Sequence, residues 1–181
     1  MAKAATATQK ETITRIYVQF SLIVAVLLLI VSGVAFWAYS FTGTMVRNEL
    51  SAQKIYFPEL GSPKLDPATY PDLQQYAGQL VDSPAKAKAY ANGYIGRHLS
   101  LVADGKVYAE VSTAAGLDPT NETLQKQKAV LFQGETLRGV LLTSGYGFGT
   151  VGIVAGIASV LALIASVGLF ATAYLLRRKL K

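Results

Sequence analysis

The sequence of 181 residues contains no cysteine and only one histidine, His98. Without thiols, the chain cannot form disulfides, thiolate zinc or iron–sulfur sites, or covalent haem attachments. A single histidine also excludes a bis-histidine haem within one chain and an iron site built from two histidines and a carboxylate. We therefore expect a protein that is not an enzyme and has no catalytic residue, cofactor or metal.

Charged residues are also scarce, at 15% of the chain against 51% hydrophobic residues. The apolar excess lies in two blocks, 16–46 and 139–176, which contain no Asp, Glu, Lys, Arg or His. Each block is longer than the ~18 uncharged residues that indicate a membrane-spanning helix. We expect transmembrane helices over 16–41 and 145–176, and so an all-α membrane protein whose two spans form a helical hairpin.

A cleaved signal peptide is the alternative for the first block. Its apolar run is about twice the length of a signal peptide's, and no A-x-A cleavage site follows it. Instead, the run leads into an aromatic cluster of the kind that settles among lipid headgroups, made of Phe36, Trp37, Tyr39 and Phe41. We interpret the block as an uncleaved anchor.

The formal net charge of +6 comes from the two ends of the chain. Segment 1–15 has a net charge of +2 and segment 177–181 of +4, whereas 47–138 contains ten basic and ten acidic residues. Positive charge beside membrane spans marks the cytoplasmic side. We expect a multi-pass plasma-membrane protein with both termini cytoplasmic, 42–144 extracytoplasmic, and no nucleic-acid partner.

Membrane lipids are the first expected partner, held by aromatic and basic side chains at the two interfaces. Tyrosines bracket both predicted spans, and two arginines follow the second. The expected anchors are Tyr17, Trp37, Tyr39, Tyr146, Tyr174, Arg177 and Arg178.

Small residues recur on one face of the second span, at Gly145, Gly149, Gly152, Gly156 and Ser159. Steps of four and three residues keep them on one helix face, where they let another backbone approach closely. Two alternatives stay open for this stripe. It receives a helix of a partner protein, or it seats the first span of the same chain against Ser21, Ala25, Ser32 and Ala35.

Four prolines within 58–71 predict an extended loop over 50–82, with at most a short helix near 73–80. Six tyrosines of the middle region are candidates for an interface, with about half of them expected in the core of the domain. They are Tyr56, Tyr70, Tyr76, Tyr90, Tyr94 and Tyr108.

Ser83-Pro84 and Asp118-Pro119 are typical of a helix N-cap followed by proline in the first turn. For the region 100–111, a β-hairpin through Asp104 and Gly105 is the alternative to a helix that ends there. The extracytoplasmic domain is thus expected to be mainly helical, with helices over 84–103, 107–115 and 119–142.

Several segments of the chain resemble one known family. They are Lys10-Glu11-Thr12 with Thr14-Arg15; the alanine-rich helix ending at His98; Gly105-Lys106-Val107-Tyr108-Ala109-Glu110; and Gln133-Gly134-Glu135-Thr136-Leu137-Arg138 leading through Tyr146-Gly147-Phe148-Gly149. They resemble the respiratory supercomplex association factors, small two-span actinobacterial membrane proteins. The resemblance implies a non-catalytic accessory subunit that docks on subunits of cytochrome bc1 and aa3 oxidase and supports assembly or stability of their supercomplex.

A stand-alone membrane sensor or regulator is the alternative function, with an extracytoplasmic domain that binds a ligand. Segments 1–15 and 177–181 are expected to be too short to carry an enzymatic or DNA-binding output. A sensor of this kind would therefore need a separate cytoplasmic partner.

The charge distribution makes a topological prediction. A reporter that is active only outside the cytoplasm should be silent when fused to either terminus and active when inserted near Gly61, because the positive charge flanks the two spans at the termini. Reporter activity at the C-terminus would contradict the hairpin.

Overall fold

The structure, a computed structural model, describes residues 2–180, with side chains described from residue 8 onward. Within these residues the secondary structure is all helical, as predicted. The described residues form no β-strand, and their β-type pairing is an isolated bridge between Tyr56 and Leu80. Two helical stretches, Thr8–Ala52 and Glu122–Arg178, are long and apolar enough to cross a membrane.

The chain divides into two compact units. The helix-pair unit consists of the first helix up to Phe41 and the last helix from Gly152 onward, and the central unit is Thr42–Val151. Each unit is described by itself below.

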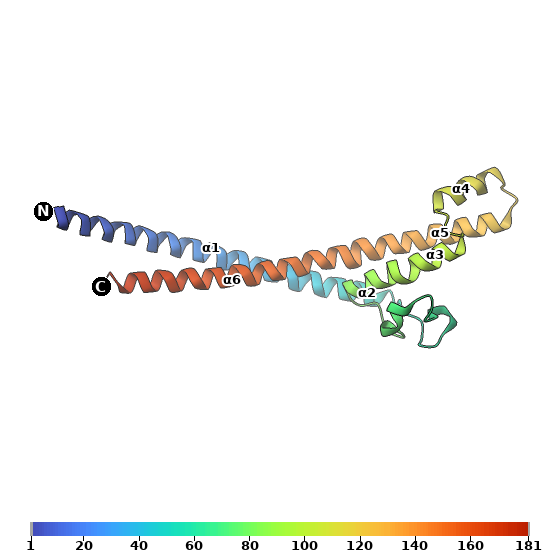
Figure 1. Ribbon diagram of the computed structural model, residues 1–181, viewed down its shortest axis with the longest axis horizontal. Coiled ribbons are helices and arrows are strands. Elements are labelled where there is room, and N and C mark those ends of the chain that lie inside the picture. The colour runs from blue at the N-terminus through green and yellow to red at the C-terminus, as the bar shows by residue number, and fades with distance from the viewer. Residues whose placement is uncertain (1, 181) are drawn as a thin grey trace. The chain divides into compact units, whose positions relative to one another are not determined.

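The first helix, α1, spans Ala2–Ala52, and the last, α6, spans Phe148–Arg178. In the helix-pair unit they lie side by side and run in opposite directions (Figure 1). Helix α1 extends beyond the predicted span 16–41 at both ends, because no proline occurs before Pro58 to interrupt it. It ends where Lys54 takes a left-handed backbone conformation, with φ of 53°.

Buried residues repeat every seven positions where α1 and α6 meet. They are Val18, Ala25 and Ser32 on α1, and Gly152, Ser159, Ser166 and Ala173 on α6. A repeat of seven keeps the same faces of two α-helices in contact when the helices coil around each other with a left hand. We call this contact the small-residue seam, since its buried positions hold Val, Ala, Ser and Gly.

The proline-rich stretch after α1 is an ordered part of the central unit. It contains two short 3₁₀ helices, η1 (Pro63–Leu65) and η2 (Pro71–Tyr76). Backbone bonds join its two ends, from Phe57 N to Gln79 O at 2.9 Å and from Val81 N to Ile55 O at 2.8 Å. The predicted loop over 50–82 therefore begins after Ala52. Helix η2 overlaps the short helix expected near 73–80, and η1 is a second short helix that was not expected.

The expected helix over 84–103 is present as three consecutive segments: α2 (Pro84–Lys88), the π-helical η3 (Ala89–Ile95) and α3 (Gly96–Val102). Ser83 caps it, accepting a bond from Lys86 N at 3.4 Å. The chain turns after α3 at Asp104 and Gly105, both with positive φ, and α4 (Tyr108–Leu117) follows in place of a hairpin. Helix α4 ends two residues beyond the predicted 107–115.

The last long helical run of the chain begins with α5 (Glu122–Val140) and continues through the π-helical η4 (Leu141–Gly147) into α6. Asp118 is not its N-cap, and the predicted start at 119 is wrong. The Asp118 carboxylate accepts bonds from the side chains of Thr120 and Asn121, while Asn121 Oδ1 caps the helix by accepting from Leu124 N at 3.2 Å. The helix predicted to end at 142 and the span predicted to begin at 145 are joined, because α5, η4 and α6 follow one another without a break.

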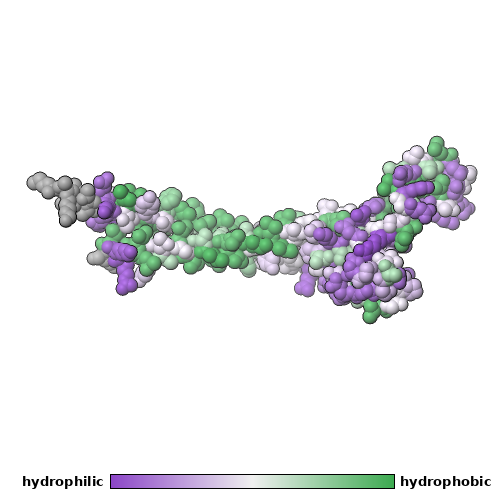
Figure 2. Space-filling view, in the orientation of Figure 1, coloured by the Kyte–Doolittle hydropathy of each residue, from purple (hydrophilic) through white to green (hydrophobic). Residues whose placement is uncertain are grey.

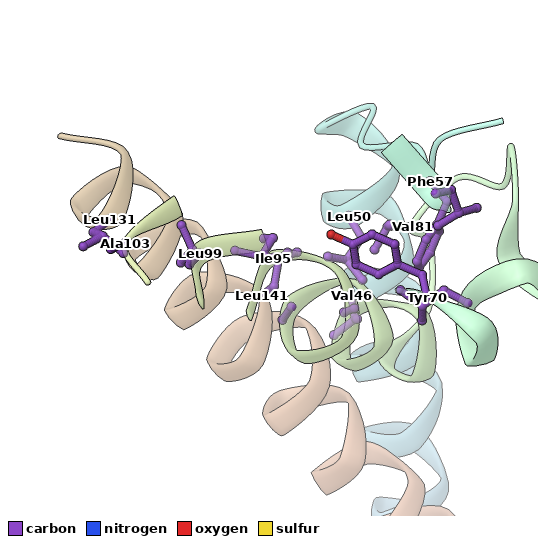
Figure 3. Close-up of a cluster of buried hydrophobic side chains, with 14 of the residues drawn as sticks. Val46, Leu50, Phe57, Tyr70, Val81, Ile95, Leu99, Ala103, Leu131 and Leu141 are labelled. Carbon is purple, nitrogen blue, oxygen red and sulfur yellow. The ribbon is translucent and has the colours of Figure 1, made fainter. Parts of the chain in front are cut away.

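The core of the central unit brings residues far apart in the sequence together (Figure 3). Phe57, Leu65, Leu73 and Val81 of the proline-rich stretch are at most 1% exposed. At Gly134 of α5, an added Cβ would lie 2.5 Å from Leu99 Cδ2, so the absence of a side chain lets α3 approach α5. Five of the six middle tyrosines belong to this core or pack against it, more than the expected half; Tyr56 is 55% exposed.

This packing makes Phe57 the most informative residue for a stability test. Phe57→Ala should lower the free energy of unfolding by about 3–5 kcal/mol, because it leaves a cavity under Tyr76 and Tyr90, whose rings lie 5.2 Å and 5.0 Å from that of Phe57. Thermal unfolding of the purified chain in mild detergent, followed by circular dichroism, measures the loss. The control is Leu60→Ala, at a position 71% exposed, where a comparable loss would contradict the packing.

Candidate docking surfaces

Serine hydroxyls bind backbone carbonyls across the small-residue seam. Ser32 Oγ donates to Ser159 O at 2.9 Å, and Ser159 Oγ donates back to Ser32 O at 2.9 Å. Nearer the chain termini, Ser166 Oγ donates to Ala25 O at 2.7 Å. A buried hydroxyl without an acceptor would be costly in apolar surroundings, so these bonds fix which faces of α1 and α6 meet.

The predicted small-residue stripe faces the chain itself. In the helix-pair unit, an added Cβ on Gly156 would lie 2.8 Å from Tyr39 Cδ2, and Ser159 bonds to Ser32. In the central unit, Gly145 meets Ala87 and Leu50, and Gly149 meets Pro84. Gly152 is buried as well. These contacts lie within the chain, but they match the intrachain alternative only in part. Of the residues expected opposite the stripe, Ser21, Ala25, Ser32 and Ala35, it is Ser32 that bonds a stripe residue, whereas Gly149 meets Pro84.

Large apolar side chains point outward from the rest of the helix pair, and the visible face of the pair is hydrophobic along most of its length (Figure 2). Ile23, Val34, Ile157 and Ile164 are between 58% and 64% exposed. No Asp, Glu, Lys, Arg or His lies within 16–41 or 152–176. This surface offers apolar contact and no charge.

One concave region interrupts this outer surface. A groove of about 430 Å³ runs between α1 and α6, and it is lined only by apolar and aromatic side chains and one glycine. Its lining residues are Phe36, Tyr39, Ile153, Gly156, Ile157, Val160 and Leu161. We call it the aromatic groove. A concave apolar surface between two helices can accept the ridge of side chains of a third helix.

The predicted interface anchors fall into two groups. Tyr17, Trp37 and Tyr174 are between 63% and 67% exposed on the helix pair, and Trp37 stacks on Phe41 with ring centroids 5.4 Å apart. Arg177 and Arg178 form the last turn of α6. Tyr146 differs, because it belongs to the central unit and has the Lys88 ammonium 4.7 Å above its ring.

The central unit carries a polar cluster that the sequence patterns did not indicate. Arg97 of α3 binds the Asp72 carboxylate of η2 through both terminal nitrogens, at 2.5 Å and 3.1 Å. The hydrogen bond from Arg97 lowers the pKa of the Asp72 carboxyl. Elsewhere in the same unit, burial raises the pKa of Tyr90 to about 12. The bonds between Arg97 and Asp72 join α3 to η2. The two residues are 25 positions apart in the sequence, so no local spacing pattern could have indicated their pairing.

Among the residues that the structure describes, no three His, Asp or Glu side chains gather closely enough to hold a metal ion. His98 instead lines a shallow apolar recess with Tyr94, Leu99 and Val130. Comparison with known protein families, curated proteins and solved structures finds no match to the chain.

The close contact between Gly156 and Tyr39 predicts the effect of added bulk at Gly156. Gly156→Leu should destabilise the helix pair by about 1–3 kcal/mol, because the new side chain meets Tyr39 of the same chain. We expect lower abundance in the membrane fraction and faster proteolysis. Gly168→Leu is the matched control on the same helix, because nothing lies within 4 Å of an added Cβ there. Equal behaviour of the two variants would contradict the contact between Gly156 and Tyr39.

Proposed function

We propose that the protein is a non-catalytic accessory subunit of a respiratory-chain membrane complex, in which α1 and α6 span the plasma membrane. In this proposal both termini face the cytoplasm and the region 42–144 lies outside. The subunit docks on the supercomplex of cytochrome bc1 and aa3 oxidase and supports its assembly or stability.

One observation carries the proposal: the helix pair buries a narrow seam and leaves its large apolar side chains uncovered. Lipid can cover most of such a surface, because acyl chains are as apolar as leucine. The aromatic groove is different, since it is concave and about 430 Å³ in volume. We assign it to a helix of the larger complex, packed by the same ridge-into-groove contact that joins helices elsewhere in membranes.

The absence of charge in the two spans supports the non-catalytic part of the proposal. Proton relays and ion sites within membranes are built from ionisable side chains, and none of Asp, Glu, Lys, Arg or His occurs in 16–46 or 139–176. The choice of complex rests on the resemblance to supercomplex association factors alone.

The test is purification through an affinity tag on this chain in mild detergent, followed by mass spectrometry of the proteins retained. Subunits of cytochrome bc1 and aa3 oxidase should copurify in fixed ratio to the chain. A chain that enters the membrane fraction but purifies alone would overturn the proposal and favour the stand-alone sensor.

Two valine variants on α6 test the aromatic groove. Val160 lines it and is 56% exposed, whereas Val154 lies outside it and is 59% exposed. Val160→Trp should fill the groove and reduce retention of the oxidase subunits at least tenfold, about 1.4 kcal/mol of lost contact. Val154→Trp adds the same bulk elsewhere and should leave retention unchanged. Loss of retention in both variants, or in neither, would contradict docking at the groove.

A further inference from the structure

A second groove of the helix pair lies beside both ends of the chain and differs in chemistry from the aromatic groove. It has a volume of about 360 Å³, and its lining residues are Arg15, Val18, Gln19, Leu22, Arg177 and Leu180. Two guanidinium groups and a carboxamide are thus combined with three apolar side chains in one concavity. We call it the arginine groove.

The electrostatics of the arginine groove favour an anion. Among the described side chains of this end, Lys10, Arg15, Arg177, Arg178 and Lys179 are basic and only Glu11 is acidic. One terminal nitrogen of Arg15 pairs with the Glu11 carboxylate at 2.6 Å. The two side chains are 67% and 47% exposed, and an exposed ion pair is weak, so Arg15 can exchange Glu11 for another anion. Arg177 forms no ion pair with any described residue.

The lining also has an apolar side. Val18 belongs to the small-residue seam, and Leu22 lies one turn further along α1, toward the uncharged part of the helix pair. A free inorganic anion would gain nothing from these side chains. An amphiphile with an anionic head and an apolar tail would contact both sides of the groove.

We propose that the arginine groove binds the headgroup phosphate of an anionic phospholipid, with an acyl chain against Val18 and Leu22. Guanidinium groups match phosphate oxygens in pairs, and basic pockets between transmembrane helices on the cytoplasmic side are known lipid-headgroup sites. The inference rests on the membrane insertion in the proposed function, but it does not depend on the identity of the larger complex.

The experiment uses the full chain, purified in mild detergent and titrated with phosphatidylglycerol or phosphatidylcholine, with bound lipid counted by native mass spectrometry. Phosphatidylglycerol should be retained and phosphatidylcholine should not. Equal retention of the two lipids would overturn the proposal. So would displacement of phosphatidylglycerol by an equal concentration of inorganic phosphate, which would identify a free-anion site.

Arginine variants separate the groove from the general positive charge of this end. Arg15→Gln combined with Arg177→Gln should weaken phosphatidylglycerol binding about 100-fold. Arg178→Gln removes charge from the neighbouring position, which does not line the groove, and should weaken binding by no more than the about fivefold expected of one basic residue near an anionic surface. If the double variant weakens binding only about 25-fold, the product of two such fivefold surface effects, the idea of a built site would be overturned.

Lipid binding and the proposed function fail in different ways. Retention of the wild-type chain in carbonate-washed membranes is measured first. A chain that the carbonate wash removes is not inserted in the membrane, and this result would contradict the proposed function as well. Normal retention together with no preference for phosphatidylglycerol would sink the lipid site alone. Copurification with the oxidase complex is scored separately for the double variant, whose aromatic groove is intact.

Discussion

Reciprocal hydroxyl-to-carbonyl bonds between Ser32 and Ser159 hold α1 and α6 at a separation that only small side chains permit. Between helices in lipid, the hydrophobic effect supplies little attraction, so close packing and interhelical hydrogen bonds must supply it. The seam provides both, since each serine bonds a backbone oxygen that close approach brings within reach. A large residue at any buried seam position would separate the backbones and break these bonds together.

A seam made of small residues determines what the rest of the pair can be. The large apolar side chains have no place inside it, so they cover the outside of the helices and need lipid or another protein around them. The predicted stripe meets the chain's own residues at Gly145, Gly149 and Gly156, which leaves little of the glycine face for a partner helix. The aromatic groove combines one residue of that stripe, Gly156, with the large apolar side chains beside it.

The sequence predicted the features that depend on local composition. Two uncharged runs predicted two long helices, and Ser83-Pro84 predicted a helix start that the structure contains. The sequence failed where neighbours in space decide the outcome. Asp and Asn are both good N-cap residues. Asn121 caps the helix, because the Asp118 carboxylate is already bound by the side chains of Thr120 and Asn121. The contacts of the Phe57 ring with Tyr76, which is stacked on it, and with Tyr90, which meets it edge-on, join distant segments. The pair of Asp72 and Arg97 does the same.

The seven-residue spacing of small residues is visible in the sequence, but the predicted stripe covers only part of it. Gly145, Gly152 and Ser159 are seven apart, and the same step continues beyond the predicted stripe to Ser166 and Ala173. On α1 the matching step runs through Val18, Ala25 and Ser32. A shared period of seven on two uncharged segments is what an antiparallel pair requires of both helices. The two repeats together therefore match the pairing of α1 with α6 that the serine hydrogen bonds show.

The same seam accounts for two grooves of opposite character on one helix pair. Small side chains at the contact let the helices approach, and the larger residues that flank the contact then stand up as walls around concave strips. The chemistry of each strip depends on which residues flank it. The aromatic groove, beside Tyr39 and Gly156, has aromatic and aliphatic walls, which suit an apolar ligand. The walls of the arginine groove include Arg15 and Arg177, which suit an apolar chain with an anionic head. The two grooves thus share one cause, the close approach of the helices at the small-residue seam, and differ in chemistry because different side chains flank the seam.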